Sequence, residues 1–119
     1  MPAMSRPHLV FVYGTLMTGE RYHELLGGSE PAGGASTAPR YRLINLGPYP
    51  ALVSGGHTAV RGELYRVDDA TLERLDHLED HPELYQRREI ELADGRRALA
   101  YFFDEAEGRE IVSGDWKRR

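Results

Sequence analysis

The 119-residue chain contains no cysteine, which excludes disulfide bonds, thiolate zinc sites and a cysteine nucleophile. No apolar run approaches the roughly 20 residues that a membrane-spanning helix needs. Residues 1–7 also lack the apolar core of a signal peptide. The net charge of −4 disfavours nucleic acid as the main partner, because phosphate binding needs a basic face. These absences predict a cytoplasmic protein that binds neither membranes nor nucleic acid.

The residues that are present are those of a single globular domain. Hydrophobic residues make up 40% of the chain and charged residues 29%, a balance typical of a folded core with a charged surface. The length suits one core, so we expect one domain over residues 1–119. Its patterns run strand, helix, several strands, helix and hairpin. This order predicts an α+β fold built on a small mixed, barrel-like sheet with flanking helices.

The first informative stretch is Leu-Val-Phe-Val-Tyr-Gly-Thr-Leu at residues 9–16. Its apolar, β-branched and aromatic residues up to Tyr13 predict a buried strand. Gly14 would let the backbone turn sharply or let a ligand approach the main chain, and Thr15 suits a cap on whatever follows. Backbone N–H groups left unpaired at such a strand end bind anions or oxyanions well. The alternative is an ordinary first strand with a tight turn.

The remaining elements follow from periodicity and from turn residues. Asp68-Asp69 offers an N-cap for a helix with an apolar face of Leu72, Leu75 and Leu78, and Pro82 ends it. Asp94-Gly95 is a hairpin signal. We expect helices at 18–26 and about 70–79, strands at 41–46, 51–53, 59–67, 86–93 and 96–103, a loop at 29–39, irregular backbone at 47–50, and a tail whose Trp116 packs over the core edge.

The second informative stretch ends the predicted helix at Glu79. A carboxylate there faces the negative end of the helix dipole and several unpaired carbonyls. With partial burial, both effects disfavour the charged form and raise the pKa of the carboxyl, as a proton-shuttling acid requires. The alternative is that Glu79 is one of several solvated acids, beside Asp80 and Glu83.

Other candidate chemistry is weaker. His77 and His81 share a four-residue spacing, but the glutamate position does not fit a zincin motif and no third ligand is evident. We therefore expect exposed histidines and no metal site. No P-loop motif and no Gly-x-Ser-x-Gly motif occur. Tyr101 is most simply a core-strand residue whose face includes Leu99 and Phe103 and whose hydroxyl is free to reach a pocket.

Six segments, taken together and in order, resemble the γ-glutamylcyclotransferase-like family. The similarity is greatest to the short γ-glutamylamine cyclotransferases and the butirosin-type deprotecting cyclotransferases. The segments are residues 11–16 (Phe-Val-Tyr-Gly-Thr-Leu), 47–52 (Gly-Pro-Tyr-Pro-Ala-Leu), 62–65 (Gly-Glu-Leu-Tyr), Leu75-Asp76 with Glu79, 84–87 (Leu-Tyr-Gln-Arg) and 114–116 (Gly-Asp-Trp).

The resemblance implies a cofactor-independent reaction on a small γ-glutamyl substrate. The α-amine of the γ-glutamyl group attacks its own side-chain carbonyl and releases 5-oxoproline and a free amine. Glu79 matches the catalytic glutamate and would act as general acid and base. The resemblance assigns substrate binding to the backbone turn and to the pocket walls, here Tyr13, Gly14, Thr15, Leu16, Pro50, Tyr85 and Tyr101.

The resemblance is compatible with three hypotheses about function. The chain is a cyclotransferase, a non-catalytic module that binds a γ-glutamyl or amino-acid ligand, or a small hydrolase that uses the same glutamate. It lacks the long extra segment of glutathione-degrading relatives, which favours γ-glutamylamines as substrates. Acidic residues near Asp80 and Glu83 would suit a cationic amine. The sequence does not predict an oligomeric state.

Overall fold

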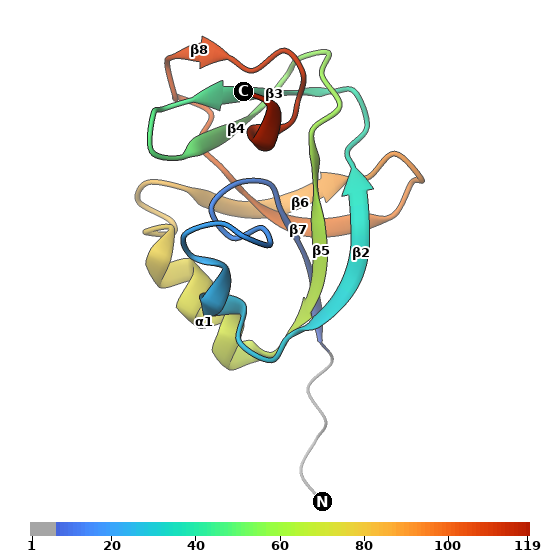
Figure 1. Cartoon of the computed structure of the whole chain (residues 1–119), viewed down its shortest axis with the longest axis vertical. Coiled ribbons are helices and arrows are strands. Elements are labelled where there is room, and N and C mark those ends of the chain that lie inside the picture. Colours follow the sequence, from blue (N-terminus) through green and yellow to red (C-terminus); the bar gives the residue numbers. More distant parts are fainter. Residues whose placement is uncertain (1–6) are drawn as a thin grey trace, which may run out of the picture.

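The fold is a mixed eight-stranded sheet that curls into a half-barrel, with one α-helix beside it (Figure 1). This computed structural model describes residues 7–119, so the inference from residues 1–6 about a signal peptide lies outside it. The strands are β1 (His8–Val12), β2 (Glu30–Ser36), β3 (Tyr41–Asn45), β4 (Pro50–Ser54), β5 (Arg61–Val67), β6 (Gln86–Glu91), β7 (Arg97–Phe102) and β8 (Arg109–Glu110). The helices are α1 (Asp69–Leu78) and two short 3₁₀ segments, η1 (His23–Leu26) and η2 (Trp116–Arg118).

Strand β7 organises the sheet, because it pairs with three other strands. Along one edge it forms an antiparallel hairpin with β6. Its other edge is shared by two parallel strands: β1 pairs where Val10 lies opposite Leu99, and β4 pairs where Leu52 lies opposite Phe102. The pairing of β1 with β7 ends close to the point where the pairing of β4 with β7 begins, so the sheet divides there. The residues that follow β1 therefore lie next to the first residue of β4.

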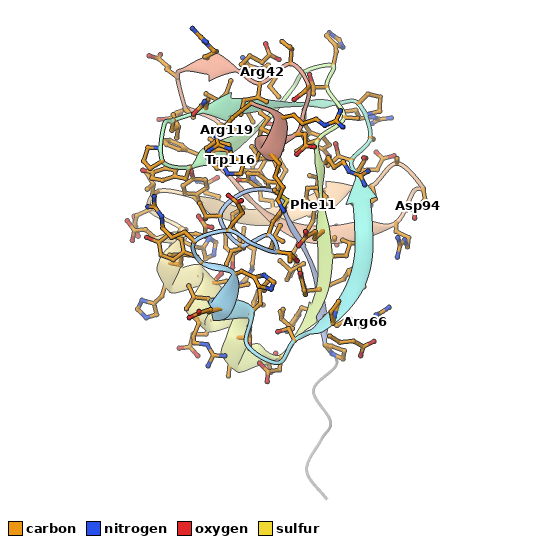
Figure 2. All side chains as sticks on the ribbon, in the orientation of Figure 1. Phe11, Arg42, Arg66, Asp94, Trp116 and Arg119 are labelled. Carbon is orange, nitrogen blue, oxygen red and sulfur yellow. The ribbon has the colours of Figure 1, made fainter. Side chains whose placement is uncertain are left out.

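The core lies inside the curl of the sheet. The helix α1 begins as predicted: Asp68 is its N-cap and accepts a hydrogen bond of 2.8 Å from the Thr71 backbone N–H. Leu72 and Leu75 are buried, which confirms the predicted apolar face. Trp116 is also buried, and the Arg119 guanidinium lies over its ring (Figure 2). The C-terminal segment therefore closes the core. Within residues 7–119, no helix is long and apolar enough to cross a membrane.

Two predicted elements were wrong. The segment expected to be a loop at 29–39 contains β2, which pairs antiparallel with β5 along most of its length. The register shifts between Pro31 and Gly34, and Gly33 has a φ of +94°, so glycines here serve a bulged strand instead of a loop. The helix expected at 18–26 is reduced to η1, because residues before it form successive turns. Gly27 is the C-cap of η1.

The hairpin of β6 and β7 forms as predicted, with Gly95 at a φ of +89°. Leu99, Tyr101 and Phe103 alternate along β7 and the residue after it, as expected, but this face of the strand is not the more buried one. Ala98, Ala100 and Phe102, on the alternate face, are buried, whereas Leu99 and Phe103 are half-buried. Because the sheet curls and is covered on both sides near β7, strict alternation does not separate inside from outside there.

Candidate active site

A cavity of about 230 Å³ opens where β1 leaves the edge of β7. Its walls come from the turn after β1, the start of β4, the end of α1 and the β6–β7 hairpin. All eight residues to which the sequence resemblance gave a role line it: Tyr13, Gly14, Thr15, Leu16, Pro50, Glu79, Tyr85 and Tyr101. The fold therefore gathers at one site residues that are up to 88 positions apart in the chain.

The turn after β1 lines this cavity and contains several backbone N–H groups without a protein acceptor. It is closed by a hydrogen bond of 3.1 Å from the Met17 N–H to the Gly14 carbonyl. Within residues 7–119, the N–H groups of Gly14, Thr15 and Leu16 donate to no protein acceptor. Thr15 does not cap a helix, since its carbonyl accepts from the Tyr22 N–H at 2.8 Å within a run of turns. Successive unpaired N–H groups can hold an anion or a developing oxyanion.

Gly14 is required by close packing against Pro50. A Cβ at position 14 would lie 2.6 Å from the Pro50 Cγ and 2.7 Å from its Cδ, well inside van der Waals contact. The proline ring, buried at the first position of β4, thus presses directly against the backbone of the turn. This contact fixes the turn relative to the wall formed by β4.

Glu79 is the C-cap of α1 and brings a carboxyl group to the cavity. Asp80, which follows, has a φ of +52°, so the chain reverses there and the Glu79 carbonyl accepts from the Tyr85 N–H at 3.2 Å. Burial raises the pKa of Glu79 from 4.5 to about 7. At neutral pH the carboxyl is therefore close to half-protonated, as an acid–base catalyst needs.

Three tyrosines form the floor of the cavity, each with its hydroxyl hydrogen-bonded to the protein. Tyr13 donates to the Tyr101 carbonyl at 2.6 Å and accepts from the Leu52 N–H at 3.2 Å, which bridges the gap between β7 and β4. Tyr85 donates to the Pro50 carbonyl at 2.8 Å. Burial, and then the charge of Glu79, raise the pKa values of Tyr13 and Tyr85. Both hydroxyls thus stay protonated and hold the walls in place.

The expected role of the Tyr101 hydroxyl was wrong. It is not free to reach a ligand, because it donates to the Asp76 carboxylate at 2.7 Å. Burial and this hydrogen bond raise the pKa of Tyr101. Asp76 also pairs with the Arg87 guanidinium, so the hydroxyl belongs to a link between α1, β6 and β7.

The two histidines have different surroundings. His77 is exposed, as predicted, but His81 is half-buried and its Nδ1 accepts from the Arg87 N–H at 3.0 Å. Across residues 7–119, no group of three or more histidine, cysteine, aspartate or glutamate side chains is placed to hold a metal ion.

Sequence reasoning missed the mouth of the cavity. Arg21, Tyr22, Pro48, Tyr49 and Leu84 also line the site. Pro48, Tyr49 and Leu84 fall in segments that carried the family resemblance, which was the available indication. Arg21 and Tyr22 fall in a segment expected to be an ordinary helix, so nothing in their spacing pointed to a site.

Comparison with known proteins agrees with this geometry. Residues 10–118 match the sequence model of the family "Gamma-glutamyl cyclotransferase, AIG2-like". The chain is 48% identical to a Vibrio cholerae protein assigned as a γ-glutamylcyclotransferase, with 94% of this chain and 97% of that protein aligned. It is 38% identical to the bovine γ-glutamylaminecyclotransferase, over 71% of this chain and 55% of the bovine one.

A solved structure gives the same result for the fold. The mouse AIG2-like protein superposes with a TM-score of 0.77 at 28% identity, over 87% of this chain and 81% of the mouse chain. Together with the family match, which spans nearly all of the described residues, this places the chain without ambiguity. The protein belongs to the gamma-glutamyl cyclotransferase, AIG2-like family.

Proposed function

We propose that this protein is a γ-glutamylamine cyclotransferase in which Glu79 is the general acid and base. The observation that carries the proposal is the position of Glu79: a carboxyl with a pKa of about 7 lines the same cavity as three unpaired backbone N–H groups. The family supports γ-glutamyl cyclotransferase activity, and a relative of 38% identity is named for γ-glutamylamines.

In this reaction a bond forms between the α-amine nitrogen and the side-chain carbonyl carbon of the γ-glutamyl group. The bond from that carbon to the released amine breaks. Glu79, as carboxylate, takes a proton from the α-ammonium so that the nitrogen can attack. It then delivers this proton to the leaving amine as the tetrahedral intermediate collapses. The attacking nitrogen loses a second proton as the ring amide forms, and the released amine takes up that proton to become an ammonium ion. The products are 5-oxoproline and the amine, and no cofactor takes part in this balance.

The rest of the cavity would supply proximity and charge stabilisation. The nucleophile and the electrophile belong to one substrate, so a wall that holds the glutamyl chain curled replaces a bimolecular encounter by an intramolecular one. The rigid rings of Tyr13, Tyr85 and Tyr101 and the Pro50 ring suit that role. The N–H groups at residues 14–16 would hold either the α-carboxylate of the substrate or the developing oxyanion.

The test is to incubate the protein with γ-glutamylamines, γ-glutamyl dipeptides and glutathione, and to detect 5-oxoproline by mass spectrometry. We expect 5-oxoproline from γ-glutamylamines, and we expect Glu79→Gln to lower turnover by about a hundredfold or more while the protein still folds. Below pH 7, kcat/KM should fall as Glu79 becomes protonated. Glu83→Gln is the matched control, since Glu83 is exposed, close in sequence and absent from the lining of the cavity.

Each of the other outcomes would indicate a different function or mechanism. Turnover by Glu79→Gln within about threefold of wild type removes Glu79 from the mechanism. Glutamate as the product, in place of 5-oxoproline, indicates a hydrolase. If γ-glutamyl ligands raise the melting temperature and no product forms, the site is a binding module.

A further inference from the structure

The mouth of the cavity carries three of the four large apolar side chains that are exposed in the part of the chain that the structure describes. Four large apolar side chains are exposed among residues 7–119: Tyr22, Tyr49, Leu84 and Val112. The first three, with exposed fractions of 36%, 38% and 41%, all line the cavity. They come from three separate segments, so their convergence does not follow from local sequence. Exposed apolar side chains gathered at a pocket mouth are typical of a ligand contact.

The mouth also carries one positive charge. Arg21 is exposed, and its guanidinium carbon lies 5.7 Å from the centroid of the Tyr22 ring. Among residues 7–119, it is the only basic side chain that lines the cavity, and Glu79 is the only acidic one. No carboxylate among residues 7–119 lies within salt-bridge distance of Arg21. Asp80 and Glu83, which from the sequence suited a cationic amine, are exposed and do not line the cavity.

From this arrangement we propose that the amine released by the enzyme has an apolar body without a cationic group, that Tyr22, Tyr49 and Leu84 contact this body, and that Arg21 excludes cationic amines. This inference rests on the proposed cyclotransferase function and names the substrate class for that site. The γ-glutamyl group occupies the buried floor beside Glu79, so the amine half extends toward the mouth.

Two physical effects act in the same direction. Each methylene of the amine that leaves water against the mouth favours binding by about 0.8 kcal/mol, equivalent to roughly fourfold in affinity. A second cation near Arg21 would be repelled, and the repulsion is strengthened where the cavity walls limit screening by solvent. An apolar amine gains from the first effect and avoids the second.

A matched pair of substrates isolates the charge. γ-Glutamyl-n-pentylamine and γ-glutamyl-diaminobutane have chains of equal length that end in a methyl group and an ammonium group, respectively. We expect wild-type kcat/KM to favour the pentylamine compound by about tenfold or more. Arg21→Gln should reduce this preference severalfold, and Arg21→Glu should reduce it further or invert it. Tyr49→Ser should lower kcat/KM for the pentylamine compound more than for the diamine.

Arg96→Gln is the control for the lost charge. Arg96 pairs with Asp94 at the tip of the β6–β7 hairpin, on the side of the molecule away from α1 (Figure 2). Its loss changes the net charge by the same amount as Arg21→Gln, and the substrate preference should stay at the wild-type value. A change as large as that of Arg21→Gln would assign the effect to net charge and overturn the role of Arg21.

Two results would contradict the inference and leave the proposed function intact, and a third would contradict the proposed function. If wild type releases 5-oxoproline from the diamine as efficiently as from the pentylamine compound, the mouth does not select against cations. If Arg21→Gln lowers kcat/KM equally for both compounds, Arg21 binds the shared γ-glutamyl group instead of sensing the amine. If no γ-glutamyl compound yields 5-oxoproline, it is the cyclotransferase function itself that fails.

Discussion

The shape of the cavity depends on the absence of a side chain at Gly14. Gly14 lies in the turn after β1, and the Pro50 ring fills the space that a Cβ would need. Because the proline is buried and begins a strand, it has little room to withdraw. A methyl group at position 14 must therefore displace the turn, which carries the three unpaired N–H groups.

We predict that Gly14→Ala destabilises the protein by about 1–3 kcal/mol, in the range of other overpacked sites. It should also lower kcat/KM by about tenfold or more, because donors displaced by even a fraction of an ångström no longer meet the reacting group. Urea denaturation and steady-state kinetics measure the two effects.

Gly28→Ala is the matched control for the Gly14 substitution. A Cβ at position 28 meets no atom within 4 Å, and the backbone is not in the left-handed region there. The control should change stability by less than about 1 kcal/mol and leave kinetics unchanged. Equal effects of the two substitutions on kcat/KM would show that the Pro50 contact is irrelevant to the site.

At the scale of elements, the segment after the turn at residues 14–17 is held from two sides. The Glu63 carboxylate of β5 accepts from the Thr18 N–H at 2.9 Å, and also from the Thr18 and Tyr65 hydroxyls. Lys117 of η2 donates to the Thr18 carbonyl at 2.6 Å. Burial alone would raise the pKa of Glu63, but these hydrogen bonds lower it on balance. The C-terminal segment and β5 thus anchor a loop whose other end forms the site.

We predict that Glu63→Ala raises KM severalfold and lowers stability by about 1–3 kcal/mol, since it frees the Thr18 donors and loosens the turn. The pH at which kcat/KM is half-maximal should not move, because Glu63 does not line the cavity that contains Glu79. The control is Glu89→Ala, which removes a carboxylate from β6 that makes only an exposed ion pair with Arg97. If Glu63→Ala left KM unchanged, the hydrogen bonds between Glu63 and Thr18 would not contribute to substrate binding.

The elements also show what local pattern can predict. Asp94-Gly95 predicted its hairpin correctly because the turn chemistry acts within a few residues. Strand β2 was missed because its sequence, Glu-Pro-Ala-Gly-Gly-Ala-Ser, has no strand propensity of its own. It is a strand only because β5 offers a partner, which is a property of the assembled sheet.

At the scale of the molecule, the site depends on the division of the sheet at β7. Glu79 and the turn at residues 14–16 could be identified from the sequence, because a family resemblance and a helix end pointed to them. The hydroxyl of Tyr13 between β7 and β4, the use of Tyr101 by Asp76 and the position of Arg21 could not. Each depends on contacts between segments that are far apart in the sequence or on a run of turns, which no local spacing encodes.

The free energy of unfolding should depend on pH because Glu79 is largely buried at the site. The pKa of Glu79 is about 7 in the folded protein and close to its ordinary 4.5 when unfolded. The folded state therefore holds this proton more tightly, and stability falls as pH rises from about 4.5 and levels off above about 7. Glu63 and Asp104 act oppositely: hydrogen bonds outweigh burial and lower their pKa values, so their contribution is lost in acid.

We thus predict a stability maximum in mildly acidic solution, followed by a decline on the order of 2 kcal/mol by pH 8 once the partial exposure of Glu79 is allowed for. Glu79→Gln cannot ionise, so the decline should be absent and the variant should be more stable than wild type at pH 8. Urea denaturation at pH 5, 6.5 and 8 measures this directly. A wild-type decline that persists in Glu79→Gln would mean that another group carries it, and the burial of the Glu79 carboxyl would then be too weak to tune its chemistry.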